Sequence, residues 1–91
     1  MKFEYLNSYD RSFKKLPDNT QKRIAKVISR FIDFILTGQR PEGLGLKKLY
    51  KDYWEIRVGL SIRILFELKD NLVTFILVGD HNQIKQFLKT F

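Results

Sequence analysis

The sequence contains no cysteine and only one histidine, and these two shortages exclude several kinds of site. Without cysteine there is neither a disulfide framework nor a thiolate metal site. One histidine and no clustered carboxylates leave too few ligands for a metal centre, so we expect no metal and no cofactor. No apolar stretch approaches the roughly 20 residues that cross a bilayer. The first residues, Met1 to Tyr5, begin no apolar signal region, so we expect a cytoplasmic protein.

Acidic residues are also scarce relative to basic ones. The chain has 17 Lys and Arg against 10 Asp and Glu, which gives a net charge of +7 and a pI near 9.8. This balance is typical of proteins whose partner is nucleic acid, an anionic membrane or an acidic protein. At 91 residues and 44% hydrophobic composition, the chain is predicted to form a single domain over residues 1–91.

The first half reads as a short strand followed by two helices. Residues 2–6 are a strand candidate, and Ser8 is expected to cap a short helix that ends before Pro17. A second helix is predicted from Asp18 to the Gly- and Pro-containing segment 37–43. Its apolar residues recur at helical spacing: Ile24, Val27, Ile28, Phe31, Ile32 and Ile35.

The segment 53–68 alternates in the manner of two strands. Trp54, Ile56 and Val58 are predicted on a core face, with Leu60, Ile62, Ile64, Phe66 and Leu68 on the same face of the next strand. We interpret Trp54 and Phe66 as core residues rather than base-stacking platforms. The requirement that both strands face one core excludes a two-residue loop and favours the loop Gly59-Leu60-Ser61.

This register places two arginines directly opposite each other. Val58 is predicted to pair with Ile62, and therefore Arg57 with Arg63. Like charges in such a pair are destabilising, and Glu55 and Glu67 are expected to relieve the repulsion only partly, from diagonal or more distant positions. A bound polyanion would relieve the repulsion, so the pair is a candidate phosphate site; the alternative is a solvated sheet face.

A third strand and a final helix complete the predicted fold. Asp70-Asn71 suits a two-residue turn. Asp80 with Gln83 resembles a capping box, which places His81 in the first helical turn near Arg63. The alternating pattern puts Val73, Phe75 and Leu77 on the core face and Thr74, Ile76 and Val78 on the arginine face, and the helix's apolar stripe is Ile84, Phe87, Leu88 and Phe91.

The predicted fold class is α+β, with a small, mostly antiparallel sheet in the order β-α-α-β-β-β-α and helices packed on one face. In this arrangement Leu65, Ile76 and Val78 line the face that the helices leave open. Such an apolar patch is typical of an interaction surface, and we expect a strand or helix of a partner protein to pack there or in an adjacent groove.

This element order, with its residue pattern, resembles the RelE/ParE toxin superfamily of bacterial and archaeal type II toxin–antitoxin systems. The resemblance covers nearly the whole chain. It implies a RelE-like mRNA endonuclease that cleaves mRNA in the ribosomal A site without metal or cofactor, and that a cognate antitoxin neutralises. The alternatives are a ParE-like toxin that poisons DNA gyrase and a catalytically weak relative kept for binding or regulation. The segments that carry the resemblance are Leu46-Lys47-Lys48-Leu49, Tyr53-Trp54-Glu55-Ile56-Arg57-Val58, Ile62-Arg63-Ile64-Leu65-Phe66 and Leu77-Val78-Gly79-Asp80-His81, followed by Ile84-Lys85-Gln86-Phe87-Leu88.

The resemblance implies roles for four candidate catalytic residues. Arg63 resembles the phosphate-contacting arginine of the family, and Arg57 falls where RelE-like members carry a basic residue. Both suit a phosphate clamp, because arginine offers a fixed fork of donors. His81 falls where an arginine or histidine acts near the leaving group, and histidine is the residue type most often used as a general acid or base. Glu55 is expected to be the general base for the attacking 2′-hydroxyl.

Two further features qualify the resemblance. Lys47, Lys48 and Lys51 are candidate contacts to the RNA backbone, although three lysines are also typical of an ordinary soluble loop. Phe87 stands where RelE proper has a catalytic tyrosine, and phenylalanine transfers no proton. Either His81 and Glu55 carry the chemistry or cleavage is weak.

Overall fold

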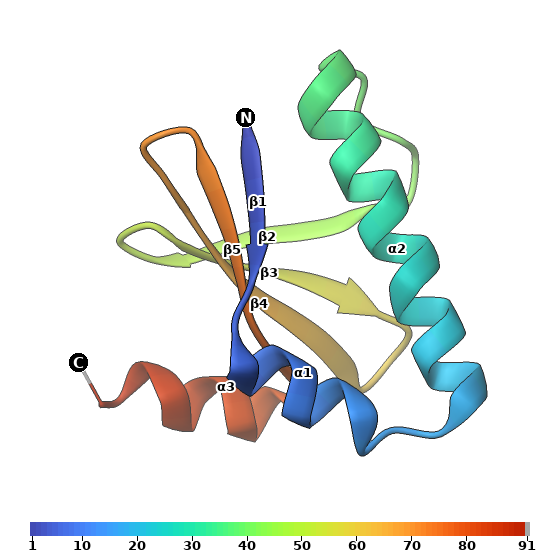
Figure 1. Ribbon diagram of the computed structural model, residues 1–91, viewed down its shortest axis with the longest axis vertical. Helices are drawn as coiled ribbons and strands as arrows, with labels where there is room; N and C mark the ends of the chain where they lie inside the picture. Colours follow the sequence, from blue (N-terminus) through green and yellow to red (C-terminus); the bar gives the residue numbers. More distant parts are fainter. Residues whose placement is uncertain (91) are drawn as a thin grey trace.

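The computed structural model describes residues 1–90, and the centre of the fold is a five-stranded sheet in the order β1-β5-β4-β3-β2 (Figure 1). β1 runs parallel to β5, and every other neighbouring pair is antiparallel. The predicted α+β class is confirmed, with a mixed sheet. The elements are β1 (Lys2–Tyr5), α1 (Asn7–Lys14), α2 (Asp18–Thr37), β2 (Gly45–Tyr50), β3 (Tyr53–Val58), β4 (Ile62–Lys69), β5 (Leu72–Gly79) and α3 (His81–Leu88).

β2 is one strand more than the sequence predicted. It pairs with β3 and contains an irregularity between Lys48 and Tyr50. Its two leucines lie three residues apart and therefore face opposite sides of the sheet: Leu46 packs against the main core and Leu49 against the smaller cluster under α3. The spacing of three residues between these leucines does not match the period of two expected for a strand, which is why the segment reads as a loop.

The main core lies between the sheet and the pair α1 and α2. α2 follows its prediction closely: it buries Ile24, Ile28 and Phe31, and it ends at Gly38, whose φ of 76° is the left-handed value typical of a helix C-terminus. Aromatic rings fill the centre, with the ring centroids of Phe31 and Phe66 only 4.7 Å apart. Each fully buried side chain of this size contributes about 1.5–3 kcal/mol.

The hairpin of β3 and β4 has the predicted register. Val58 pairs with Ile62 and Arg57 with Arg63, and Gly59 has a φ of 66° in the three-residue loop. The prediction was wrong for Leu60, which is 99% exposed because it lies at the tip of that loop and not in β4. The Asp70-Asn71 turn is confirmed, with φ values of 52° and 63°.

A β-bulge in β5 overturns the predicted faces of its last residues. Leu65 pairs with Leu77 and the next residue, Phe66, pairs with Phe75, so Ile76 is the extra residue. Beyond the bulge the alternation is reversed. Val78 belongs to the main core and Leu77 packs with the opposite cluster, where strict alternation predicted the converse.

α3 packs on the other face of the sheet, so the expectation that all helices share one face was wrong. Ile84 of α3 is buried against Leu65 and Ile76. The apolar patch predicted for a partner is therefore covered by the chain's own helix. The predicted capping box is confirmed by bonds between Asp80 and Gln83 in both directions, of 2.9 and 2.8 Å. Phe91, predicted on the apolar stripe, lies outside the described residues.

α1 is attached to β5 by two serine hydroxyls. Ser8, predicted as a helix cap, is not one: the cap position is Leu6, and the Ser8 hydroxyl donates to the carbonyl of Ile76 at 2.5 Å. The Ser12 hydroxyl accepts from the backbone N–H of Val78 at 3.0 Å. These bonds give partners to backbone groups of β5 that lie beyond the end of β1 and so have no strand beside them.

Replacing Ser12 by alanine is expected to lower the free energy of unfolding by about 1–2 kcal/mol, because the N–H of Val78 loses its acceptor. Urea denaturation measures this change. Ser29→Ala, at an exposed position of α2, is the matched control and is expected to change stability by less than about 0.5 kcal/mol. Equal effects of the two substitutions would contradict the role of Ser12.

Candidate functional site

Arg57 and Arg63 stand side by side on the face of the sheet that carries α3, and Glu55 joins them. Nε of Arg63 lies 2.9 Å from Oε2 of Glu55, an ion pair whose side chains are 15% and 5% exposed respectively. Glu55 sits diagonally across from Arg63, so the contact predicted to relieve the repulsion only partly does form. It uses one donor of Arg63 and leaves the four N–H groups of Nη1 and Nη2.

Arg57 is the exposed member of this group. Its other cross-strand neighbour is Gly45, and a Cβ atom built on Gly45 would lie 3.0 Å from the Cβ of Arg57. The absence of a side chain at Gly45 therefore leaves room beside the Cβ of Arg57. Among residues 1–90, Arg57 has no carboxylate within ion-pair distance. Two arginines and one carboxylate leave a net positive charge, which favours an anion at this position.

The three candidate lysines are not brought together. Lys47 pairs with Glu55 and shares the face of the arginines. Lys48 pairs with Trp54 on the opposite face, where its Nζ lies 5.9 Å from the centre of the indole ring. Lys51 lies in the turn after β2 with its Nζ 5.3 Å from the centre of the Tyr50 ring. Only Lys47 is placed to extend the arginine pair.

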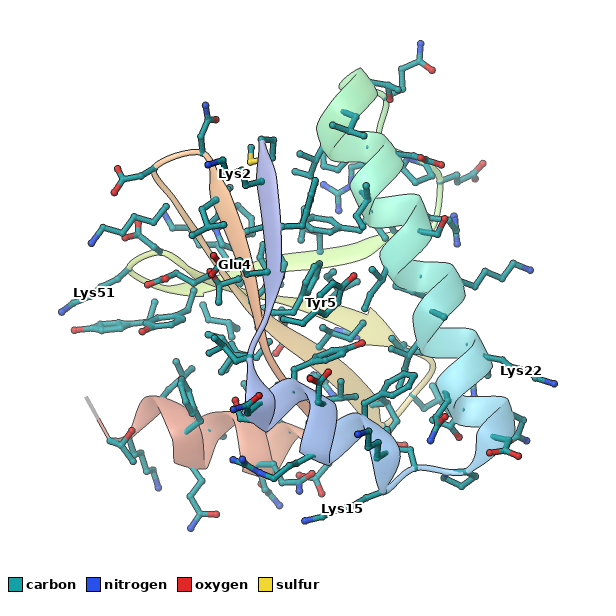
Figure 2. The ribbon with its side chains drawn as sticks, viewed as in Figure 1. Lys2, Glu4, Tyr5, Lys15, Lys22 and Lys51 are labelled. Atoms are coloured by element: carbon teal, nitrogen blue, oxygen red, sulfur yellow. The ribbon has the colours of Figure 1, made fainter. Side chains whose placement is uncertain are left out.

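The remaining basic charge is spread around the molecule. Figure 2 shows Lys15, Lys22 and Lys51 pointing outward from different parts of the chain. The net charge of +7 thus does not form one patch. It creates a general attraction for anionic partners, while the arginine pair supplies the localised site.

His81 is the first residue of α3 and is exposed. It follows Gly79, the cross-strand partner of Arg63, by two residues. The capping box holds the backbone on both sides of His81, since Asp80 and Gln83 bond to each other. The sequence-based expectation that His81 lies near Arg63 thus agrees with the strand register.

Phe87 of α3 packs on the face of the sheet that carries the arginines. Its ring lies edge-on to Tyr53, with 6.2 Å between the centroids. Burial raises the pKa of the Tyr53 phenol, and the nearby carboxylates of Glu67 and Asp52 raise it further. Tyr53 is therefore protonated at neutral pH and is no base.

The described residues restrict what chemistry this face can perform. Within residues 1–90 there is no group of three or more histidine, aspartate or glutamate side chains arranged to hold a metal ion. No helix in that range is long and apolar enough to cross a membrane. What the face offers is a pair of arginines on adjacent strands, with a histidine two residues beyond the strand partner of Arg63. This combination suits binding and proton transfer at a phosphodiester.

Solved structures with the same fold are toxins or their complexes with antitoxins. The RelB–RelE antitoxin–toxin complex from Methanococcus jannaschii aligns with 92% of this chain and 96% of that chain, at 23% identity and a TM-score of 0.71. The E. coli DinJ–YafQ complex aligns with 91% and 96% of the two chains, at 19% identity and a TM-score of 0.71. The YoeB dimer from Staphylococcus aureus aligns with 89% and 97%, at 19% identity and a TM-score of 0.66.

No protein of curated function matches the sequence. The family model described as the ParE toxin of type II toxin–antitoxin systems matches residues 3–85, which is most of the chain. The match includes both arginines, Glu55 and His81. The chain therefore belongs to the ParE toxin family, within the RelE/ParE superfamily of type II toxin–antitoxin toxins.

Proposed function

We propose that this toxin is an endoribonuclease that cleaves mRNA in the ribosomal A site and needs no metal or cofactor. The observation that carries the proposal is the placement of Arg57 and Arg63 directly opposite each other, with Glu55 engaging only Nε of Arg63. Two adjacent guanidinium groups with free donors match the oxygens of a phosphodiester. Such a site acts in the cytoplasm, where mRNA and ribosomes are found.

In the proposed reaction the 2′-hydroxyl of the RNA attacks the adjacent phosphorus. Its oxygen forms a bond to phosphorus and its proton leaves to solvent, while the bond from phosphorus to the 5′-oxygen breaks. His81 gives a proton to the departing 5′-oxygen. The products are a 2′,3′-cyclic phosphate and a free 5′-hydroxyl. Arg57 and Arg63 stabilise the negative charge that gathers on the phosphoryl oxygens in the transition state.

We assign Glu55 a positioning role in place of the general-base role expected from the resemblance. Its side chain is 5% exposed and its carboxylate already accepts from Arg63. Because this carboxylate is buried and already bonded to Arg63, it is poorly placed to reach a 2′-hydroxyl on the bound RNA. Its effect is to orient the guanidinium so that Nη1 and Nη2 face the phosphate.

The proposed partners are the mRNA with its ribosome and a cognate antitoxin. Two of the structural relatives are, by their names, complexes of a toxin with its antitoxin. A net charge of +7 favours an acidic antitoxin. Lys47 is proposed to contact the RNA backbone beside the arginines. Lys48 and Lys51 lie away from the arginine pair, so they are proposed to contact other segments of the ribosome-bound RNA.

Cell-free translation with the purified chain tests the nuclease directly. We expect new mRNA 5′ ends within translated codons, detected by primer extension. Arg63→Ala is expected to lower the cleavage rate about 10²–10³-fold through loss of charge stabilisation. His81→Ala is expected to lower it about 10²–10⁴-fold through loss of the general acid. Lys22→Ala, on the exposed surface of α2, is the control; intact mRNA with the wild-type chain would refute the proposal.

Glu55→Gln separates positioning from proton transfer in the same assay. Glutamine still accepts a hydrogen bond from Nε of Arg63 but takes up no proton at neutral pH. A positioning role predicts that Glu55→Gln keeps most of the activity and that Glu55→Ala loses it. If both variants lose cleavage activity equally while their thermal stability is unchanged, the result would support a general-base role for Glu55.

The family match itself favours a second candidate, a toxin that poisons DNA gyrase. In that case the chain inhibits supercoiling by purified gyrase, His81→Ala remains toxic, and translated mRNA stays intact. Absence of both gyrase inhibition and cleavage would identify a catalytically weak relative, for which Phe87 is the main structural support.

A further inference from the structure

The two outer edges of the sheet, β1 and β2, differ in how well they are protected from other strands. An edge strand exposes unpaired backbone groups, and proteins commonly block such an edge with lysines or with an irregular strand. β2 has both features, with Lys47, Lys48 and a register shift between Lys48 and Tyr50. β1 keeps an unbroken register against β5 and carries one lysine and one glutamate, Lys2 and Glu4. β1 is therefore the edge that is open to another strand.

The hydrogen bonds of β1 show which of its backbone groups point outward. The N–H of Lys2 donates to the carbonyl of Asn71 at 2.9 Å, and the N–H of Leu6 also donates to a carbonyl of β5. Because alternate residues of a strand bond to the same neighbour, the N–H and C=O groups of Phe3 and Tyr5 point away from β5. Within residues 1–90 no strand other than β5 pairs with β1, so these groups are available to a further strand.

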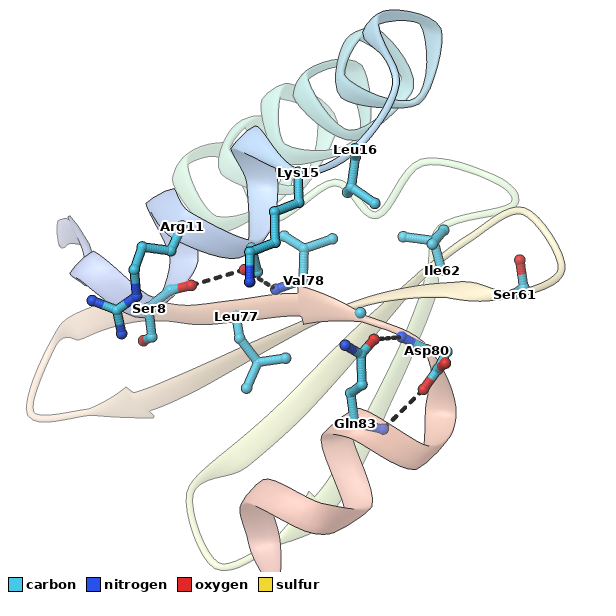
Figure 3. Close-up of a pocket in the computed structure, with 12 residues that line it drawn as sticks. Ser8, Arg11, Lys15, Leu16, Ser61, Ile62, Leu77, Val78, Asp80 and Gln83 are labelled. Carbon is cyan, nitrogen blue, oxygen red and sulfur yellow. Dashed lines mark hydrogen bonds between the residues drawn. The ribbon is translucent and has the colours of Figure 1, made fainter.

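Beyond the end of β1 the same side of the sheet is closed by α1. The Ser8 hydroxyl donates to the carbonyl of Ile76. The Ser12 hydroxyl accepts from the N–H of Val78, and Figure 3 shows α1 lying along β5 at this point. A further strand can therefore pair with residues 1–5 but cannot continue along β5.

The side chains of β1 divide into a charged side and an apolar side. Figure 2 shows Lys2 and Glu4 on one side of the strand and Tyr5 on the other. Lys2 and Glu4 are both exposed, and among residues 1–90 neither has an ion-pair partner. Tyr5 is 45% exposed, and Met1, just before the strand, is 47% exposed. The edge thus offers unpaired charges of both signs together with exposed apolar groups.

These features are complementary to a second, antiparallel copy of the same strand. With Phe3 opposite Phe3 of the second copy, the outward backbone groups of the two strands meet as hydrogen-bonded pairs. Lys2 then lies opposite Glu4 of the second copy, and the two-fold symmetry repeats this pair. On the other side Met1 lies opposite Tyr5 of the second copy, a thioether against an aromatic ring. Opposite charges in cross-strand pairs are stabilising, and so are aromatic contacts.

Charge also selects this register among the possible ones. The neighbouring registers that keep the backbone hydrogen bonds place either Glu4 opposite Glu4 or Lys2 opposite Lys2, and like charges directly opposite each other are destabilising. A shift by a single residue places Phe3 opposite Glu4, whose backbone groups are turned toward its own β5. β1 therefore specifies one antiparallel pairing with itself.

We propose that two copies of the chain associate through β1, so that their sheets join into one continuous sheet across a two-fold axis. Arg57 and Arg63 lie on β3 and β4, and β5 separates these strands from β1. The arginine pair of each copy therefore stays open in the dimer. Because β1 has only four residues and each copy carries a charge of +7, we expect weak, concentration-dependent association.

Sedimentation equilibrium of the purified full chain, from about 10 μM to about 1 mM, tests the association. We expect a monomer–dimer equilibrium, with ¹⁵N NMR shift changes over the same range concentrated at the amides of Phe3 and Tyr5. Glu4→Lys is expected to weaken dimerisation at least about tenfold, because like charges then lie opposite each other. The control Glu42→Lys makes the same change in net charge at an exposed turn and is expected to change the dissociation constant by less than about threefold.

The charge-swapped variant Lys2→Glu/Glu4→Lys keeps the net charge and restores opposite charges across the interface. We expect it to dimerise within about threefold of the unmodified chain. Thermal melting shows whether each variant is folded, and Glu4→Gln replaces Glu4→Lys if the latter is not.

Three results would overturn the proposal. The chain could stay monomeric at about 1 mM, which would leave the edge to a strand of another protein. Glu4→Lys and Glu42→Lys could weaken the dimer equally, which would place the interface on another surface. The charge-swapped variant could fail to recover dimerisation. The samples contain no ribosome and no mRNA, so failure of dimerisation and failure of mRNA cleavage are observed independently.

Discussion

The bulge at Ile76 determines how the two faces of the sheet are used. One extra residue in β5 reverses the alternation, so that Val78 turns into the main core while Ile76 and Leu77 lie on the side of α3. The bulge also coincides with the point where β1 ends and the serines of α1 take over the hydrogen bonds of β5. The sheet can thus be covered by α1 and α2 on one face and by α3 on the other.

Most of the fold was predictable because its elements follow regular periods. The helical spacing from Asp18 onward, the alternation of β3 and β4, and the Asp70-Asn71 turn each predict the observed structure. The errors occur where a period is interrupted. The bulge at Ile76 and the irregularity in β2 both place side chains against strict alternation, and no local residue pattern announces either one.

The candidate site was predictable in part for the same reason. Register alone places Arg57 opposite Arg63. The ion pair between Glu55 and Arg63 depends on the burial and geometry of their side chains. That burial follows from the packing of α3 on the same face of the sheet. The separation of the three lysines likewise depends on β2 being a strand, whose alternation sends Lys47 and Lys48 to opposite faces. The sequence shows which residues are charged, but the face of the sheet on which each charged side chain lies depends on the strands that form.

The attachment of α3 connects stability to function. Ile84 is the one residue of this helix within the described range that is fully buried, and the capping box supplies the other firm constraint at its start. His81 lies within that first turn, so its distance from the arginines is set by a few contacts only. Phe87 and Leu88 also pack against the cluster beneath the helix but are only partly buried, so the helix is held less firmly than the buried strands beneath it. A change at Asp80 or Gln83 would therefore act on the position of His81, because these two residues fix the first turn of α3.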